Sequence, residues 1–340
     1  MSLFNWSRLS LGNISSLLDA MGKLGIRRVW LAIVLADFAM FLFAVQSWSR
    51  LMLPPSMADV RDLAEKAPLV FRGPVLTVTP ITTNTEPGAR VESIAKIQVD
   101  RWYRGNGSTE ALLRFAYSGE IFANGHDCID FRPETYWTVF AIEKNGQMEM
   151  IDDCEGALTI SPLFGLTIGN GDWLAQMEAD FRAGLNDHDS APRLASIQRL
   201  GGLKLPSSRD ALHRVIGKGD EAESKWAVYA ALRTGDVTVL SLVNHLLAKG
   251  DGELPERAIA MQLQYVTDPS AVPDLIAILK SAPSELTRAG VLIALGEKLK
   301  DPRAVPSLAD HLSDPTRYAR YDALDGLKNI THEGACTLPP

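Results

Sequence analysis

The sequence predicts a multi-domain chain with an N-terminal transmembrane helix, a small all-β barrel and a C-terminal all-α solenoid. Three observations lead to this fold class. An eight-residue phrase, DPSAVPDL at 268–275, returns as DPRAVPSL at 301–308. An apolar segment of membrane-spanning length occupies 29–48, and short alternating apolar runs with turn residues between them fill much of 67–163.

The repeated phrase predicts stacked pairs of helices. Its two copies lie 33 positions apart, and a looser copy begins at Asp236. Self-similarity at a period of about 20–50 residues is typical of stacked-repeat proteins. Asp followed by Pro suits the N-cap and the first position of a helix. A second helix is expected in each unit, because the segments 226–232, 257–263 and 288–295 are counterparts spaced by 31 positions.

These repeats resemble the HEAT family, in particular the short HEAT-like repeats of the phycobilisome-lyase type. The resemblance covers about 190–331 and depends on the phrase Asp-Pro-x-Ala-Val-Pro-x-Leu. It implies a protein-binding or scaffold role, because units that cannot bury their apolar faces alone form one extended stack. The lyase name brings no catalytic residues that match positions in this chain.

The segment from Val29 to Trp48 is expected to cross a membrane as a helix, since a span needs about 20 apolar residues. Four basic residues precede it, at 8, 23, 27 and 28, and only Arg50 follows closely. The positive-inside rule then places the N-terminus in the cytoplasm. The bulk of the chain would be extracytoplasmic, in a bacterial periplasm or at a cell surface.

Two other interpretations of this segment stay open, a cleaved signal peptide and a buried helix. The stretch Ala44-Val45-Gln46 is a poor signal-peptidase site, and the charged lead-in is long for a signal. Asp37 is the unfavourable residue, because a carboxylate at mid-membrane costs about 2.5 kcal/mol or more. It could be protonated, face a partner helix, or be tolerated in a very apolar run.

The middle of the chain reads as short strands separated by turns, which is typical of a small β-barrel or sandwich. Asn145-Gly146 predicts a two-residue hairpin between neighbouring strands. The expected strands are 69–78, with a bend or bulge at Gly73-Pro74, then 91–102, 111–115, 135–143 and 148–151.

The order of these strands resembles the netrin and tissue-inhibitor-of-metalloproteinase type of OB barrel over about 58–162. The segments that carry the resemblance are 69–75, 97–105, 136–141 and 154–156. In the inhibitors an N-terminal cysteine chelates the protease zinc, and this chain has no cysteine before Cys128. The resemblance therefore implies the fold and does not imply protease inhibition.

Cys128 and Cys154 flank the last strands of the barrel and are expected to form a disulfide outside the cytoplasm. Such a bridge would stabilise the fold by about 3 kcal/mol in the chain-entropy model. A redox or metal role is the alternative, but the chain has no CxxC spacing. Cys336 is left over, either as a free thiol or as a pair with another chain.

The region after the barrel begins with apolar residues at helical spacing from Trp173 to Leu185, which predict a connecting helix. The predicted domains are therefore a cytoplasmic tail at 1–28, the transmembrane helix at 29–48, a linker at 49–66 and the barrel at 67–163. The connecting helix follows at 164–188, the HEAT-like repeats at 189–331 and a tail at 332–340.

A search for reactive groups finds no catalytic, cofactor or metal site that we would predict. The histidines are scattered, and no pair has the i, i+4 spacing of a helical zinc site. His126, Asp127 and Asp130 could hold a cation, and Asp152-Asp153 with Glu155 is acidic, but a solvated loop explains each group. With a net charge of −7 and no basic block after the N-terminal region, nucleic acid is not expected as a partner.

The sequence thus predicts a binding protein and no enzyme: a membrane-anchored, extracytoplasmic scaffold or adaptor that binds a protein partner through its repeats and barrel. The alternative is an enzyme, or the regulatory subunit of an envelope enzyme, with a site at the junction of barrel and solenoid that includes His126, Asp127 and Asp130. A third hypothesis is an envelope protein that self-associates through its membrane helix at Asp37.

Overall fold

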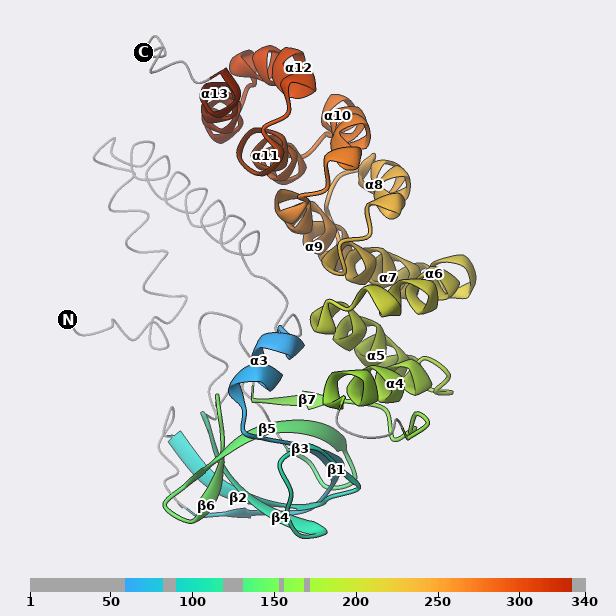
Figure 1. The fold of residues 1–340 in the computed structure, drawn as a ribbon, viewed down its shortest axis with the longest axis vertical. Coiled ribbons are helices and arrows are strands. Elements are labelled where there is room, and N and C mark those ends of the chain that lie inside the picture. The colour runs from blue at the N-terminus through green and yellow to red at the C-terminus, as the bar shows by residue number, and fades with distance from the viewer. Residues whose placement is uncertain (1–58, 82–89, 119–130, 153–155, 168–171, 332–340) are drawn as a thin grey trace, which may run out of the picture. The chain divides into compact units, whose positions relative to one another are not determined.

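The computed structural model of the chain describes residues 59–81, 90–118, 131–152, 156–167 and 172–331 (Figure 1). The predicted transmembrane helix from Val29 to Trp48, including Asp37, lies outside these residues. So do all three cysteines, at 128, 154 and 336. None of the helices within the described ranges combines the length and the apolar composition that a bilayer crossing requires.

The middle of the chain forms a closed five-stranded barrel. Its strands pair in the order β1-β2-β4-β6-β5, and β5 pairs with β1 again to close the ring. All of these pairings are antiparallel except β4 with β6, which is parallel. The barrel strands are β1 (Leu69–Pro80), β2 (Arg90–Gln98), β4 (Glu110–Ser118), β5 (Tyr136–Lys144) and β6 (Gln147–Met150), with β3 (Arg101–Arg104) and β7 (Ala157–Thr159) added beside β1 and β5. The predicted small barrel is confirmed, and the finer likeness to the netrin type stays a prediction.

Local chemistry accounts for the turns and irregularities of the barrel. Asn145 and Gly146 both have positive φ angles, 53° and 73°, as the predicted two-residue hairpin requires. Gly73 does not break β1: a Cβ atom there would lie 1.7 Å from the carbonyl oxygen of Gln98, so only glycine admits this close approach. The register shift in β1 lies slightly later, between Val75 and Thr77.

Two differences from the sequence-based strands have tertiary causes. The expected strand 91–102 is split, because β2 ends at Gln98 and the Asp100 amide donates to the Arg72 carbonyl at 3.0 Å, which starts β3 beside an earlier part of β1 than the part that pairs with β2. The predicted linker 49–66 contains a short helix, α3 (Val60–Lys66). Asp59 caps it, accepting from the Asp62 amide at 3.3 Å, and its apolar side is buried.

The C-terminal part is a solenoid of paired helices, and the HEAT-like prediction is confirmed. Figure 1 shows the first helices of the pairs in one row and the second helices in another. The first helices are α6 (Arg209–Lys218), α8 (Leu240–Leu247), α10 (Val272–Ser281) and α12 (Val305–Asp310). The second helices are α5 (Ser190–Leu203), α7 (Glu221–Arg233), α9 (Leu254–Gln262), α11 (Glu285–Ile293) and α13 (Arg317–Thr331). The predicted connecting helix is α4 (Trp173–Gly184), which contacts α5 and the barrel strand β3.

The repeated phrase sets the start of three pairs, those that begin with α8, α10 and α12, in the same way. Asp236, Asp268 and Asp301 each accept a hydrogen bond from the amide two residues later, at 3.0, 2.9 and 2.8 Å. A 3₁₀ turn of three residues follows the aspartate, and the α-helix begins directly after this turn. The second proline of the phrase lies in the first turn of the α-helix. The Asp-Pro dipeptide therefore caps a 3₁₀ turn and not the α-helix itself.

Successive second helices pack closely because small residues meet between them. A Cβ atom on Gly296 would lie 2.2 Å from the Cα of Gly326 in α13, and one on Gly201 would lie 2.8 Å from Ala230 in α7. Gly296 lies in a π-helical turn, Ala294–Leu299, that extends α11. These contacts make the row of second helices a continuous packed layer.

Candidate functional site

Three of the second helices share an arginine that holds the loop before its own helix. In α5, α11 and α13 this residue is Arg193, Arg288 and Arg320, four positions after the N-cap. Its Nη1 donates to the carbonyl oxygens six and five residues earlier: at 2.9 and 2.9 Å for Arg193, 3.3 and 3.0 Å for Arg288, and 2.7 and 3.2 Å for Arg320. The same contact thus recurs along the solenoid.

A cation on one second helix also reaches a carboxylate at the start of the next. Arg193 pairs with Glu223 at 2.8 Å, and Arg288 pairs with Asp314 at 2.8 Å. In α7 the cation stands one position later in the helix. It is Lys225, which lies 2.8 Å from Glu253, the N-cap residue of α9. We call these three ion pairs the inter-repeat ladder. They join α5 to α7, α7 to α9 and α11 to α13. The Arg193 and Arg288 pairs lie at low solvent exposure, where ion pairs count for more than on an open surface, whereas Glu253 is 66% exposed.

The solenoid also exposes tyrosine side chains, two of them in its last helix. Tyr318 and Tyr321 in α13 are 70 and 41% exposed, and Tyr265, which follows α9, is 62% exposed. Arg317 stacks over the Tyr321 ring at 5.1 Å and donates to its hydroxyl oxygen from Nη2 at 2.8 Å. Tyrosine and arginine are the residues that most often carry binding energy at protein interfaces. This end of the solenoid is therefore the best candidate surface for a protein partner.

A second candidate region is the junction between the barrel and α4, which is held by a buried carboxylate. The side chain of Asp180 in α4 is fully buried. It pairs with Arg101 at 2.6 Å and Arg72 at 3.3 Å, and accepts from the Tyr103 hydroxyl at 2.7 Å. Burial first, and the Asp180 charge next, raise the pKa of Tyr103, so its hydroxyl stays a donor.

The segment after β7 is tied to the same junction. Arg72 donates to the carbonyls of Ser161 at 2.9 Å and Leu163 at 3.2 Å, and its guanidinium lies 4.2 Å from the centre of the Phe164 ring. The Ser161 hydroxyl donates to Asp187 at 2.6 Å, and this hydrogen bond is the main cause that lowers the pKa of Asp187. These contacts fix the path of the chain from barrel to solenoid.

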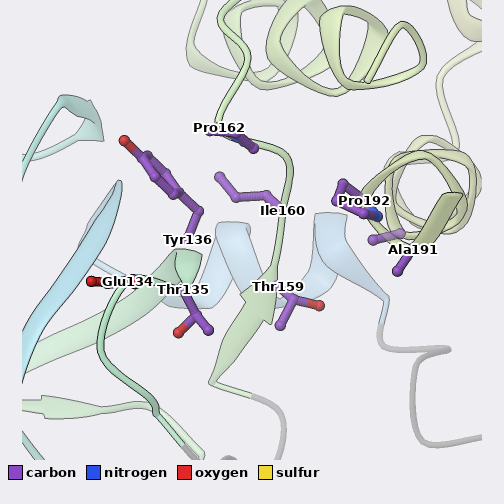
Figure 2. A pocket seen from close by; sticks show the side chains of 9 residues that line it. Glu134, Thr135, Tyr136, Thr159, Ile160, Pro162, Ala191 and Pro192 are labelled. Atoms are coloured by element: carbon purple, nitrogen blue, oxygen red, sulfur yellow. The ribbon is translucent and has the colours of Figure 1, made fainter. Parts of the chain in front are cut away.

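A cavity of about 420 Å³ lies beside this segment. Figure 2 shows its lining side chains approaching from the start of β5, from the end of β7 and the residues after it, and from the start of α5. The lining is mostly apolar, with the Tyr136 ring and Ile160 among its walls and Glu134 as its one acid. Such a cavity could hold a small apolar group, but its described lining has no paired acid and base for proton transfer.

The structure brings few of the sequence-based candidate residues together. His126, Asp127, Asp130, Asp153 and Glu155 lie outside the described residues, and Asp152 is exposed. Within the described ranges, Asp187, His188 and Asp189 could each offer a ligand atom to one cation, but the last two are exposed and no ion is present.

Sequence analysis missed Arg72 and Asp180, which no local pattern relates. It also missed the inter-repeat ladder, although Arg257 and Arg288 already stand at equivalent places in the aligned second helices. A search for charges that recur at the repeat period would have found the ladder positions.

Comparisons with known proteins agree with the helical architecture. A family profile described as HEAT repeats matches residues 241–328. Among solved structures, the complex of CpcE and CpcF of phycocyanin lyase from Nostoc sp. PCC7120 is similar at 21% identity and a TM-score of 0.37, covering 49% of this chain and 69% of that chain. No curated protein matches the sequence.

The prediction that the chain is no enzyme is corrected by this comparison. The similar solved structure belongs to a lyase complex, so a non-catalytic role does not follow from the presence of HEAT-like repeats. At this level of similarity the comparison carries no residue role and no activity over to this chain.

Proposed function

We propose that this chain is an adaptor that binds a protein partner through its HEAT-like repeats. The observation that carries the proposal is the row of second helices, locked by the inter-repeat ladder and ending in exposed Tyr318 and Tyr321 beside Arg317. A rigid row of helices presents a preorganised surface, which lowers the entropic cost of binding. The barrel, fixed to α4 through Asp180, adds a second rigid surface at the other end of the repeats.

We further propose that the adaptor is held at a membrane by the segment from Val29 to Trp48, with the barrel and repeats outside the cytoplasm. The support is the length and apolar composition of this segment and the basic residues before it. In that compartment Cys128 and Cys154 would be oxidised to a disulfide.

Partner binding is tested by affinity purification of the tagged full chain from a mild detergent extract, with quantitative mass spectrometry. The proposal expects one other protein in an amount comparable to the chain. It also expects that protein to be lost when both exposed tyrosines are changed, as Tyr318→Ala with Tyr321→Ala. Exposed Leu112 on the barrel, as Leu112→Ala, is the matched control. Repeated recovery of this chain alone would contradict the proposal.

Membrane topology is tested by labelling the cysteines in intact cells with a membrane-impermeant thiol reagent, before and after reduction. Cys336 is expected to react without reduction if it is a free thiol, and Cys128 and Cys154 only after reduction. Labelling of all three only after the cells are opened would place the bulk of the chain in the cytoplasm and refute the proposed location.

A second candidate function is an enzyme, or a regulatory subunit, with a site at the junction of barrel and solenoid. The observation that favours it is the 420 Å³ cavity of Figure 2. A bound small molecule should raise the melting temperature of the full chain in a ligand screen. Ala195→Trp, which fills the cavity from α5, should abolish that rise. A screen without any such rise would remove this candidate.

A further inference from the structure

We propose that the outer face of α13 docks a helix of a protein partner whose first turn carries a carboxylate. This face is defined by Arg320, Tyr321, Leu324 and Lys328 and is called the α13 outer face. The inference deepens the proposed adaptor function and rests on it, because it names the surface used and the chemistry of the partner.

The ladder has an incomplete rung at Arg320. Arg193 and Arg288 each make two kinds of contact, one to the loop before their own helix and one to a carboxylate at the start of the next second helix. Arg320 makes only the first kind, through Nη1 to the carbonyls of Asp314 and Pro315. Within the described part of the chain it has no ion pair. Its remaining guanidinium donors are therefore available for an acid in the equivalent place.

The face of α13 that a following helix would cover is partly exposed. In α5 and α11 the residues four positions after the ladder arginine, Ile197 and Leu292, are 1 and 0% exposed. Their counterpart in α13 is Leu324, which is only partly buried, and Tyr321 beside it is 41% exposed. An apolar and aromatic surface next to an incompletely paired arginine has the composition of an interface centre.

The side chains of this face favour a partner helix over one more packed repeat. Eight positions after the ladder arginine, α5 and α11 have Gly201 and Gly296, against which the next helix packs at backbone contact. The counterpart in α13 is Lys328, and the position after Arg320 holds the large side chain of Tyr321. Because interhelical distance depends on the side chains at the contact, a helix on this face would lie farther out than a repeat does. A detachable partner fits that spacing better.

The ladder also specifies the occupant. Its acids stand at the N-cap or the third position of the following helix, as Glu253 and Glu223 do, or just before the helix, as Asp314 does. A negative charge there also complements the helix dipole. A second copy of this chain is a poorer occupant, because the acids of its own rungs are already paired.

The test is site-specific photo-crosslinking in the cells that make the protein, with p-benzoylphenylalanine replacing Tyr321 in the full chain. We expect a cross-link to another protein that maps to the first two turns of a helix with Asp or Glu at its start. Arg320→Ala should lower the yield about tenfold, as the loss of an interface arginine does. Arg320→Lys should keep part of it, and Lys280→Ala, which removes an exposed cation of α10, should have no effect.

Because Arg320 also holds the loop before α13, Lys328→Glu serves as a second variant that reverses a charge of the face without touching that loop. It should lower the yield severalfold. Cross-links to a second copy of this chain, an unchanged yield in both variants, or no cross-link would overturn the inference. If the tagged chain still co-purifies with a partner in that case, the adaptor function stands and only this surface is wrong. If no partner is recovered, both fail.

Discussion

Replacing Asp180 with asparagine tests how the barrel is fixed to the helices. The variant keeps the size of the side chain and removes its charge. Arg72, whose side chain is 1% exposed, then loses its counter-ion, and Arg101 loses a partner at 2.6 Å. Breaking a buried ion pair from one side typically costs about 3–5 kcal/mol, because the remaining charge is buried without compensation. The free energy of unfolding should fall by that amount.

The assay is urea unfolding of the full chain in mild detergent, followed by tryptophan fluorescence, with Trp102 and Trp137 in the barrel and Trp173 and Trp226 in the helices. With a slope of about 1–3 kcal/mol per molar urea, the midpoint should shift by at least about 1 M. Glu65→Gln, which breaks the exposed ion pair with Arg61, should leave it unchanged.

The combination of Arg72→Met, Tyr103→Phe and Asp180→Leu should recover most of the loss, since apolar side chains replace the ion pair and the hydroxyl that donates to Asp180. Arg101 can turn towards solvent, because it is already 18% exposed. A loss below about 1 kcal/mol for Asp180→Asn would show that this carboxylate does not hold the junction.

Three further predictions concern the repeats. Gly296→Ala should destabilise the chain by about 1–3 kcal/mol, because its Cβ atom would meet the Cα of Gly326 at 2.2 Å. Gly217→Ala in α6, whose Cβ atom would meet nothing within 4 Å, should stabilise the chain slightly. Equal melting temperatures of the two variants would argue against close packing of α11 on α13. A double-mutant cycle on Arg288→Ala and Asp314→Ala should give a coupling free energy of about 1–3 kcal/mol. The same cycle on the exposed pair Lys328 and Asp325 should give a much smaller coupling free energy. Equal coupling free energies would show that the ladder does not stabilise the chain. Burial first, then Glu297 and Asp325, raise the pKa of Asp322 to about 6 from 3.8. The folded protein therefore binds this proton more tightly than the unfolded chain does, so stability should fall as pH rises from about 4 to about 6. Asp322→Asn should lack that fall when urea midpoints are compared across the range, and parallel curves would contradict the assignment.

The parts of the fold that sequence analysis predicted are those set by local chemistry. The Asp-Pro phrase specifies a cap and a first turn, so its recurrence places the start of the helix pairs that carry it without knowledge of packing. Asn145-Gly146 likewise specifies a hairpin, because both positions need a positive φ angle. These elements could be predicted since each depends on residues adjacent in the chain.

The parts that it missed depend on residues far apart. No residue near Arg72 in the sequence indicates that its partner is Asp180. An arginine in a strand is expected to be exposed, whereas Arg72 is only 1% exposed in the fold. The helix α3 escaped detection because it is only seven residues long and is stabilised by burial of Val60, Leu63 and Ala64. The division into β2 and β3 also follows from a tertiary contact, the hydrogen bond from Asp100 to Arg72.

The candidate site was predictable at the level of the architecture and not at the level of the residues. Repeats indicate a binding surface in general, whereas the exposure of Tyr318 and Tyr321 and the incomplete pairing of Arg320 become visible only when neighbouring helices are in place.

The most direct test of the adaptor account is hydrogen–deuterium exchange of the full chain, alone and with its co-purified partner. We expect the partner to slow exchange in the second helices near the C-terminal end, above all in α13, while α8, α10 and the barrel strands keep the rates of the free chain. Protection confined to the barrel or to the first helices, or no protection anywhere, would contradict binding through this surface.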